Sequence, residues 1–165
     1  MKLPQGLPSK NTNIIELYPT IDATKLMCEI LSFKRKYQDN DWTTAGIIVA
    51  GGRGLGSKEN FDLIYKLCDA IDAKPAASRC AVELGWAESG IQVGQTGCSV
   101  APKLYLAFGI SGAMQHLVGI ENAEKIIAVN TDTNAPIMSS SDIAINADAV
   151  ETLKNLIMEA KPDLL

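Results

Sequence analysis

From Gly46 onward, short apolar runs alternate with stretches whose apolar positions repeat at helical spacing. The run 46–50 (GIIVA) has no polar side chain and is followed by glycines, which is typical of a strand buried on both faces of a parallel sheet. Residues 59–73 then carry apolar side chains at helical spacing, and Ser57 is a suitable N-cap. A buried strand followed by a helix is half of a βαβ unit, so this pattern predicts an α/β fold.

Further apolar runs predict more strands along the rest of the chain. They start near or at Ala76, Ile91, Leu104, Lys125 and Asp142. A closing helix is predicted over about 148–160. This alternation predicts a doubly wound, mostly parallel open sheet with helices on both faces, which binds its ligands at the carboxyl ends of the strands.

The residues before Gly46 have a weaker pattern. Two β-like runs, 14–18 and 26–33, predict peripheral strands within an otherwise polar stretch. We therefore divide the chain into a lead-in, 1–45, and a main domain, 46–165. No apolar leader segment opens the sequence, and no run approaches the roughly 18 apolar residues of a membrane helix, so we expect neither secretion nor membrane insertion.

Composition removes several classes of function. Fifteen basic and nineteen acidic residues give a net charge of -4 without a basic block, so we expect no nucleic acid and no anionic membrane surface as partner. The four cysteines form no CxxC pair and the chain has one histidine. These counts predict no metal site and no disulfide framework, and they indicate a reducing compartment.

The glycine-rich segment GGRGLGSK, which starts at Gly51, follows the first buried strand. It is not a P-loop, because Ser57 and Lys58 stand in the reverse order, and Ser57 also replaces the third glycine of a dinucleotide fingerprint. Its glycine amides and Arg53 are suited to hold an anion at the start of a helix. A tight turn with an exposed arginine is an equally good interpretation of the loop alone.

Polar residues also follow the other predicted strands, so several loops should meet at one edge of the sheet. Arg79 is either a surface ion-pair partner or a ligand contact, and Gln95 and Thr96 form a turn that can also bind a ligand. Ser111 is a candidate cap for a helix with His116 in its second turn, although a lone histidine is more often structural. With no second base or carboxylate pair, the predicted site binds rather than catalyses. Further candidates, suited to hydroxyl or amide contacts or simply to turns and caps, are Ser78, Asn130 and Asp148.

A set of segments, in order and at natural spacing, closely resembles the C-terminal, FAD-binding domain of the electron transfer flavoprotein α subunit. The segments are GGRGLGSKENF, ASR, GW, QVGQTG, APKLY, GISGAMQH and AVNTDTNAPI. The resemblance implies a deoxyhypusine synthase-like NAD/FAD-binding fold from about Gly46 to the C-terminus, with FAD across the carboxyl edge of the sheet. It also implies binding residues at the matching positions: Arg53, Ser78, Arg79, Val93, Gly94, Gln95, Thr96, Ser111, Gly112, Ala113, Met114, Gln115, His116, Asn130 and Asp148.

The resemblance further implies which part of FAD each residue contacts. Arg79 and His116 lie beside the isoalloxazine ring, where a positive charge or a hydrogen bond raises its reduction potential. Gln95 and Thr96 bond the ring, with Thr96 at the N5 edge. The pyrophosphate and adenosine ends are bound by the loop around Arg53, Ser111, Gly112, Asn130 and Asp148.

The implied function is electron transfer without substrate chemistry of its own. The carrier takes electrons from flavin dehydrogenases, or from a partner flavin, and passes them to a quinone-reducing or other acceptor. The implied partner is the electron transfer flavoprotein β subunit in a heterodimer, in bacterial or archaeal cytoplasm or in the mitochondrial matrix. Two alternatives stay open: an NAD-dependent or acyl-transferring enzyme with His116 as acid or base, and a module that binds nucleotide only structurally.

The chain departs from the family pattern at several places. Cys98 and Ser99 replace a pair that is commonly basic then apolar, and Thr131 replaces a frequent lysine. We expect the lost positive charges to lower FAD affinity or potential. The family's α subunits also carry an N-terminal domain that packs against the β subunit and makes them roughly twice as long. We therefore expect an excised domain, and a naturally short relative is the alternative.

Overall fold

Five parallel strands form one open sheet in the computed structural model, which describes residues 42–164. The strands are β1 (Ile47–Gly51), β2 (Lys74–Ala77), β3 (Leu104–Phe108), β4 (Ile126–Asn130) and β5 (Ile143–Asn146). Their order is β2-β1-β3-β4-β5, and every neighbouring pair is parallel. The chain thus winds outward from β1 to β2, then returns past β1 to β3 and continues to β5. The predicted doubly wound α/β class is confirmed.

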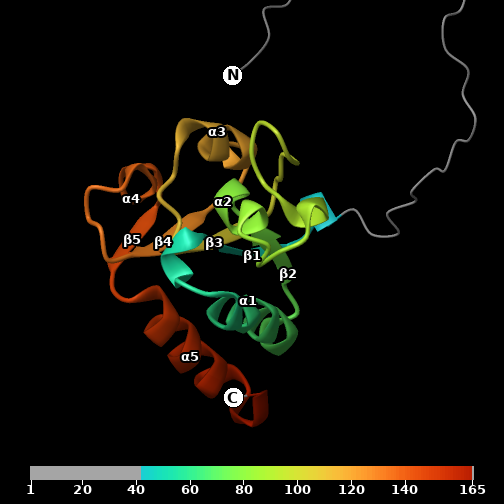
Figure 1. The fold of residues 1–165 in the computed structure, drawn as a ribbon, viewed down its shortest axis with the longest axis vertical. Helices are drawn as coiled ribbons and strands as arrows, with labels where there is room; N and C mark the ends of the chain where they lie inside the picture. Colours follow the sequence, from blue (N-terminus) through green and yellow to red (C-terminus); the bar gives the residue numbers. More distant parts are fainter. Residues whose placement is uncertain (1–41, 165) are drawn as a thin grey trace, which may run out of the picture. The chain divides into compact units, whose positions relative to one another are not determined.

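Both faces of the sheet are covered, as predicted, but by different kinds of structure. The long helices α1 (Lys58–Ile71) and α5 (Ala149–Ala160) pack on the face that carries Val49 and Phe108. The opposite face, with Ile48 and Tyr105, lies under the short helices α3 (Met114–Leu117) and α4 (Pro136–Ser140) and their loops. Figure 1 shows these two groups of helices on opposite sides of the sheet. The short helix α2 (Arg79–Glu83) directly follows β2.

The ends of the two long helices follow local sequence signals. Ser57 caps α1 as predicted, because its hydroxyl accepts a hydrogen bond from the amide of Asn60 at 3.2 Å. Asp148 caps α5 in the same way, accepting from the amide of Glu151 at 2.8 Å. Asp72 ends α1 in the left-handed conformation, with a φ of 52°.

The predicted strand at Ile91 is wrong. Residues Ser89–Ile91 form a 3-10 turn, and Gln92 then makes only an isolated parallel bridge to Ala77, the last residue of β2. Val93 forms its isolated bridge with Cys98 rather than with β2, and Gly94, with a φ of 136°, then turns the chain away. The apolar side chain of Val93 is instead buried in the core. An apolar run of this length does not by itself distinguish a strand from a buried loop.

The predicted cap at Ser111 is also wrong. Helix α3 starts at Met114 with Ala113 as its N-cap, so His116 lies in the first turn rather than the second. The intervening Gly112 has a φ of 78°, and a Cβ there would come within 2.5 Å of the Ile137 amide nitrogen. The carbonyl of Ser111 accepts from that same amide at 3.1 Å, which holds this loop against α4.

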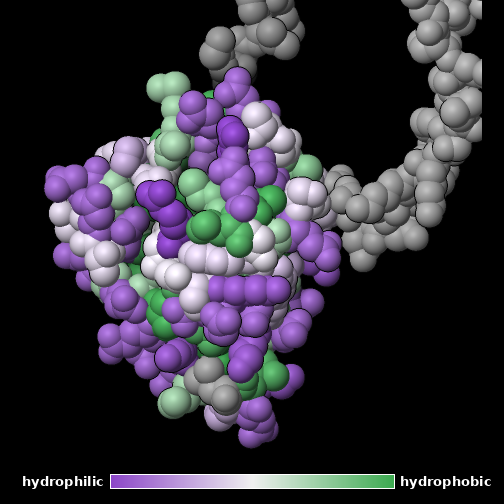
Figure 2. All heavy atoms as spheres, in the orientation of Figure 1, coloured by the Kyte–Doolittle hydropathy of each residue, from purple (hydrophilic) through white to green (hydrophobic). Residues whose placement is uncertain are grey.

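The packed body extends upstream of the predicted boundary at Gly46. Trp42, in the 3-10 turn Trp42–Thr44, is buried in the apolar core on the face of the sheet that carries Ile48 and Tyr105. The predicted peripheral strands at 14–18 and 26–33 lie outside the described residues, and the division at 45 stays a prediction. None of the helices within 42–164 has the length and hydropathy needed to cross a membrane. In the view of Figure 2, hydrophilic residues cover most of the surface, and apolar residues gather over α2.

Candidate functional site

The carboxyl ends of β1 to β4 are level with one another, so the loops that follow them start at one edge. Gly51 pairs with both Ala77 and Phe108, and Phe108 pairs with Val129. The chain leaves β1 and β3 in opposite directions across the sheet, and a crevice opens at such a switch point. A cavity of about 390 Å³ lies there, within the usual size range of small-molecule sites.

Most of the predicted binding residues border this cavity. They are Arg53, Ser78, Arg79, Val93, Gly94, Gln95, Thr96, Ser111, Gly112, Ala113, Gln115, His116 and Asn130. Met114 and Asp148 do not: the Met114 side chain is 77% exposed, and Asp148 caps α5. Within the single turn of α3, Gln115 and His116 border the cavity while Met114 is exposed at the surface. The resemblance of this segment to the family motif does not show which of its residues face the cavity.

Sequence reasoning missed several residues that also border the cavity: Gly54, Cys80, Gln92, Gly109, Ile110, Asp132 and Ala135. Most of them are immediate neighbours, in the sequence, of predicted binding residues. That proximity was the only indication in the sequence that they could border the site. Asp132 accepts from the amide of Asn134 at 2.9 Å, so its carboxylate shapes the loop after β4. Cys80, the second residue of α2, is an exposed thiol.

The glycine-rich loop does not offer the free amides that an anion cradle needs. The amide of Gly52 donates to the carbonyl of Phe108 and that of Gly54 to the carbonyl of Gly109, both at 2.9 Å. A Cβ on Gly54 would come within 2.7 Å of the Gly109 oxygen. The glycines therefore let the loops after β1 and β3 touch, and the backbone-anion interpretation is wrong for these amides. Arg53 is exposed and remains a cation at the cavity wall.

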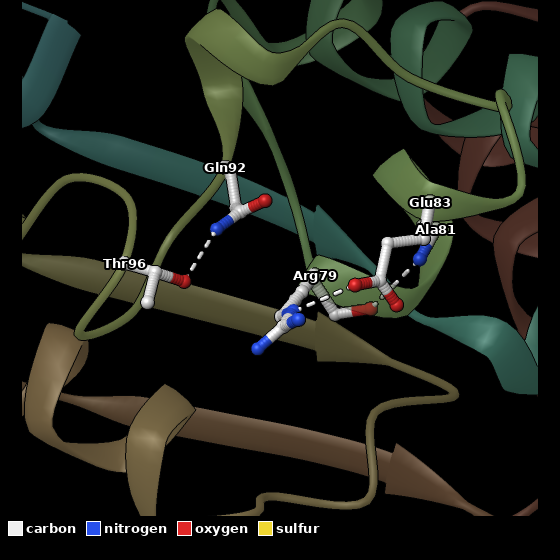
Figure 3. Close-up of polar contacts among 6 residues, drawn as sticks. Arg79, Ala81, Glu83, Gln92 and Thr96 are labelled. Atoms are coloured by element: carbon white, nitrogen blue, oxygen red, sulfur yellow. Dashed lines mark hydrogen bonds and ion pairs between the residues drawn. The ribbon is translucent and has the colours of Figure 1, made fainter.

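Arg79 is an exposed cation whose side chain makes an ion pair with Glu83. Its Nε donates to Glu83 Oε1 at 2.7 Å, one helical turn along α2, with 66% and 57% of the two side chains exposed. The far end of the guanidinium points away from Glu83 (Figure 3). Ser78 fixes the start of α2, since its hydroxyl accepts from the amide of Ala81 at 3.4 Å. The ion pair thus orients Arg79 and leaves terminal nitrogens for other contacts.

The loop of Gly94 to Gly97 is held by several hydrogen bonds, and two of them link pairs of residues that border the cavity. The amide of Gln95 donates to the carbonyl of Gln115 at 2.8 Å, which joins this loop to α3. Gln92 Nε2 donates to the Thr96 hydroxyl oxygen at 3.0 Å (Figure 3). Because the Thr96 oxygen acts as the acceptor in this bond, its own proton is free to be donated elsewhere.

His116 is almost fully buried, with 7% of its surface exposed. Its Nε2 lies 3.1 Å from the hydroxyl of Tyr105, and its Nδ1 is buried with no hydrogen-bond partner among the described residues. Burial lowers the pKa of His116 to about 4. The Val93 backbone lies close enough to oppose this decrease of the pKa, but it does not meet the geometry of a hydrogen bond to the ring. The imidazole is therefore neutral at pH 7. Of the two contributions expected from His116, a positive charge or a hydrogen bond, only the hydrogen bond remains.

Asn130, the last residue of β4, connects two loops. Its Nδ2 donates to the carbonyl of Ile110 at 2.9 Å, and its Oδ1 accepts from the amide of Asp132 at 3.0 Å. The side chain therefore already has a structural role at the cavity rim. No group of three or more potential metal ligands occurs within 42–164.

Known proteins with similar sequences indicate the same family as the motifs at the cavity. The family model described as "Electron transfer flavoprotein FAD-binding domain" matches residues 41–121. Over these residues the chain belongs to that family. A "Protein FixB" of Clostridium saccharobutylicum is 50% identical over 140 residues, and a "Probable electron transfer flavoprotein subunit alpha, mitochondrial" of Caenorhabditis elegans is 44% identical over 143. A "Protein FixB" of Azotobacter vinelandii is 43% identical over 158.

The matches to these electron transfer flavoprotein relatives cover most of this chain but less than half of theirs. The three alignments span 85%, 86% and 94% of this chain, and 41%, 43% and 44% of the respective relatives. Those proteins are named as FixB or α subunits, and the alignments span less than half the length of each.

Proposed function

We propose that the cavity binds FAD and that this chain serves as the FAD-binding part of an electron transfer flavoprotein α subunit. The observation that carries the proposal is the convergence of separate loops, each resembling a family motif, on one cavity at the β1/β3 switch point. The matched family is described as FAD-binding. The cations and hydroxyls at the cavity wall fit a ligand that carries phosphates and ring carbonyls.

The roles of the residues follow from their surroundings. Arg79 supplies positive charge beside the flavin ring, and Thr96 donates its free hydroxyl proton to the ring. His116 contributes a neutral hydrogen bond, because burial keeps it uncharged. Arg53 neutralises the pyrophosphate. The cofactor supplies the electron chemistry when bound, and the protein supplies binding and electrostatics.

We further propose a β subunit as the partner. Three large apolar side chains, Leu84, Met114 and Val118, are 52%, 77% and 43% exposed on and just after α2 and α3, the helices that border the cavity. Exposed apolar surface beside a ligand site fits a protein cover. The donors are flavin dehydrogenases or a partner flavin, and the acceptor is quinone-reducing or another carrier. The compartment is the cytoplasm or the mitochondrial matrix, according to the source.

The first alternative, an enzyme with His116 as acid or base, has less support. A general acid–base group works best with a pKa near the operating pH, whereas the pKa of His116 is lowered to about 4. Its Nε2 also faces buried Tyr105 rather than a ligand. The second alternative, a structural nucleotide site, predicts that bound flavin does not cycle at physiological potentials, so a redox titration separates it from the carrier.

The test is FAD titration of the full chain, with and without the β subunit, followed by flavin absorption and fluorescence. We expect Arg79→Gln to weaken binding roughly tenfold, as for loss of a charge-assisted contact. Lys125→Gln is the matched control, since it removes one positive charge next to the amino end of β4, at the opposite edge of the sheet. Absence of binding even with the β subunit, or equal weakening in both variants, would contradict the proposal.

Asp148 is tested separately, because it caps α5 and does not border the cavity. Asp148→Ser keeps a capping hydroxyl and removes the carboxylate. Weaker FAD binding by this variant would place the carboxylate in the site, and unchanged binding would limit it to capping.

A further inference from the structure

Tyr105 and His116 form an isolated polar pair inside the apolar core. Tyr105 lies on β3 with none of its surface exposed, and His116 reaches it from α3. The hydroxyl oxygen and Nε2 are 3.1 Å apart, and the ring centroids are 6.1 Å apart at 57°. Among the described residues the Tyr105 hydroxyl has no other hydrogen-bond partner, and Nδ1 has none at all.

The pair holds a fixed number of protons, because both groups stay neutral at pH 7. Burial raises the pKa of Tyr105 far above its usual value and lowers that of His116. One proton therefore sits on the hydroxyl and one on the imidazole. The distance between the two groups leaves open which of them donates, so the two tautomers of His116 must be compared.

Counting unpaired groups separates the two tautomers. With the proton on Nδ1, the Tyr105 hydroxyl donates to Nε2, and only the Nδ1–H lacks a partner. With the proton on Nε2, both the Tyr105 hydroxyl proton and the Nδ1 lone pair lack partners. Each unpaired buried polar group costs free energy, so the first arrangement is favoured.

We propose that Tyr105 is a positioning residue that fixes His116 as the Nδ1–H tautomer and so sets the orientation of the imidazole at the cavity wall. His116 borders the cavity and Tyr105 does not, so Tyr105 acts only through the imidazole. The tautomer is a property of the ligand-free chain. Its use toward a ligand rests on the proposed FAD function.

The first experiment reads the tautomer directly. The chain contains a single histidine, so the imidazole nitrogen signals of the full-length ¹⁵N-labelled protein belong to His116 alone. At pH 7 we expect a pyrrole-type shift for Nδ1 and a pyridine-type shift for Nε2. The reverse assignment, or a rapid average of the two, would overturn the proposal without any variant.

Tyr105→Phe tests the role of the hydroxyl while keeping the shape of the ring. We expect the Nδ1–H tautomer to lose its dominance and the two nitrogen shifts to move toward each other. Tyr65→Phe is the matched control, because Tyr65 packs against Phe61 on the opposite face of the sheet. Unchanged His116 shifts in Tyr105→Phe, or equal changes in Tyr65→Phe, would overturn the role of Tyr105.

FAD titration separates this inference from the proposed function. Tyr105→Phe is expected to bind FAD roughly three- to tenfold more weakly, as for one weakened hydrogen bond. In a His116→Asn background the same substitution should have no effect, because Tyr105 acts through the imidazole. If FAD does not bind but the tautomer is as expected, the proposed function fails and the positioning role stands. If FAD binds equally well to wild type and to Tyr105→Phe, the use of this imidazole toward the ligand is overturned.

Discussion

Acidification should weaken the fold through His116, because the folded protein buries this imidazole in its neutral form. Burial lowers its pKa from 6.5 to about 4. Between these two values the unfolded chain binds a proton that the folded chain does not. Stability is therefore fully present above about pH 6.5 and falls as the pH decreases toward 4.

The size of the loss follows from these two pKa values. Proton linkage gives a decrease in the free energy of unfolding of about 2 kcal/mol between pH 7 and pH 5, rising to about 3 kcal/mol by pH 4. The pKa values of Glu59 and Asp142 are lowered by hydrogen bonds from usual values of 4.5 and 3.8. Their contributions are lost only as the pH falls below that range, so the interval from pH 7 to pH 5 reports mainly on His116.

The assay is urea unfolding at a series of pH values between 7 and 5, for wild type and His116→Gln. The variant starts from a lower stability, because it loses the contact with Tyr105, but it has no imidazole to titrate. Its free energy of unfolding should stay nearly constant, while that of wild type decreases by about 2 kcal/mol. A flat wild-type profile, or parallel profiles for both proteins, would refute the buried neutral imidazole.

Three other predictions test the packing. Gly54→Ala should cost about 1–3 kcal/mol by denaturant unfolding, because its Cβ meets a backbone carbonyl at 2.7 Å, whereas Gly46→Ala meets nothing within 4 Å and serves as control. Phe61→Ala removes a side chain with 0% exposure and should cost about 3–5 kcal/mol; a loss below 1 kcal/mol would contradict its place in the core. Alkylation followed by mass spectrometry should modify exposed Cys80 quickly and Cys68 only after unfolding, because burial raises the pKa of Cys68 to about 12. Equal rates in the folded protein would contradict this difference.

The two long helices and most strands were predictable because their signals are local. The run GIIVA, the helical repeat after Ser57 and the closing helix at Asp148 each contain the periodicity or the cap that defines the element. The segment at Ile91 was not predictable in this way. Val93 is buried and Ile91 is half-buried, but whether this segment pairs with a strand depends on where β2 ends and on the turn at Gly94.

The sequence by itself also determined which segments resemble cofactor motifs, because identity at matched positions needs no coordinates. Only the tertiary structure decided that the glycine amides are hydrogen-bonded to the loop after β3, and that Asp148 caps a helix away from the cavity. It alone placed Tyr105 against His116, which lie eleven positions apart in the chain. Burial and pairing depend on which elements pack together, so the protonation state of His116 cannot be read from its neighbours in the chain.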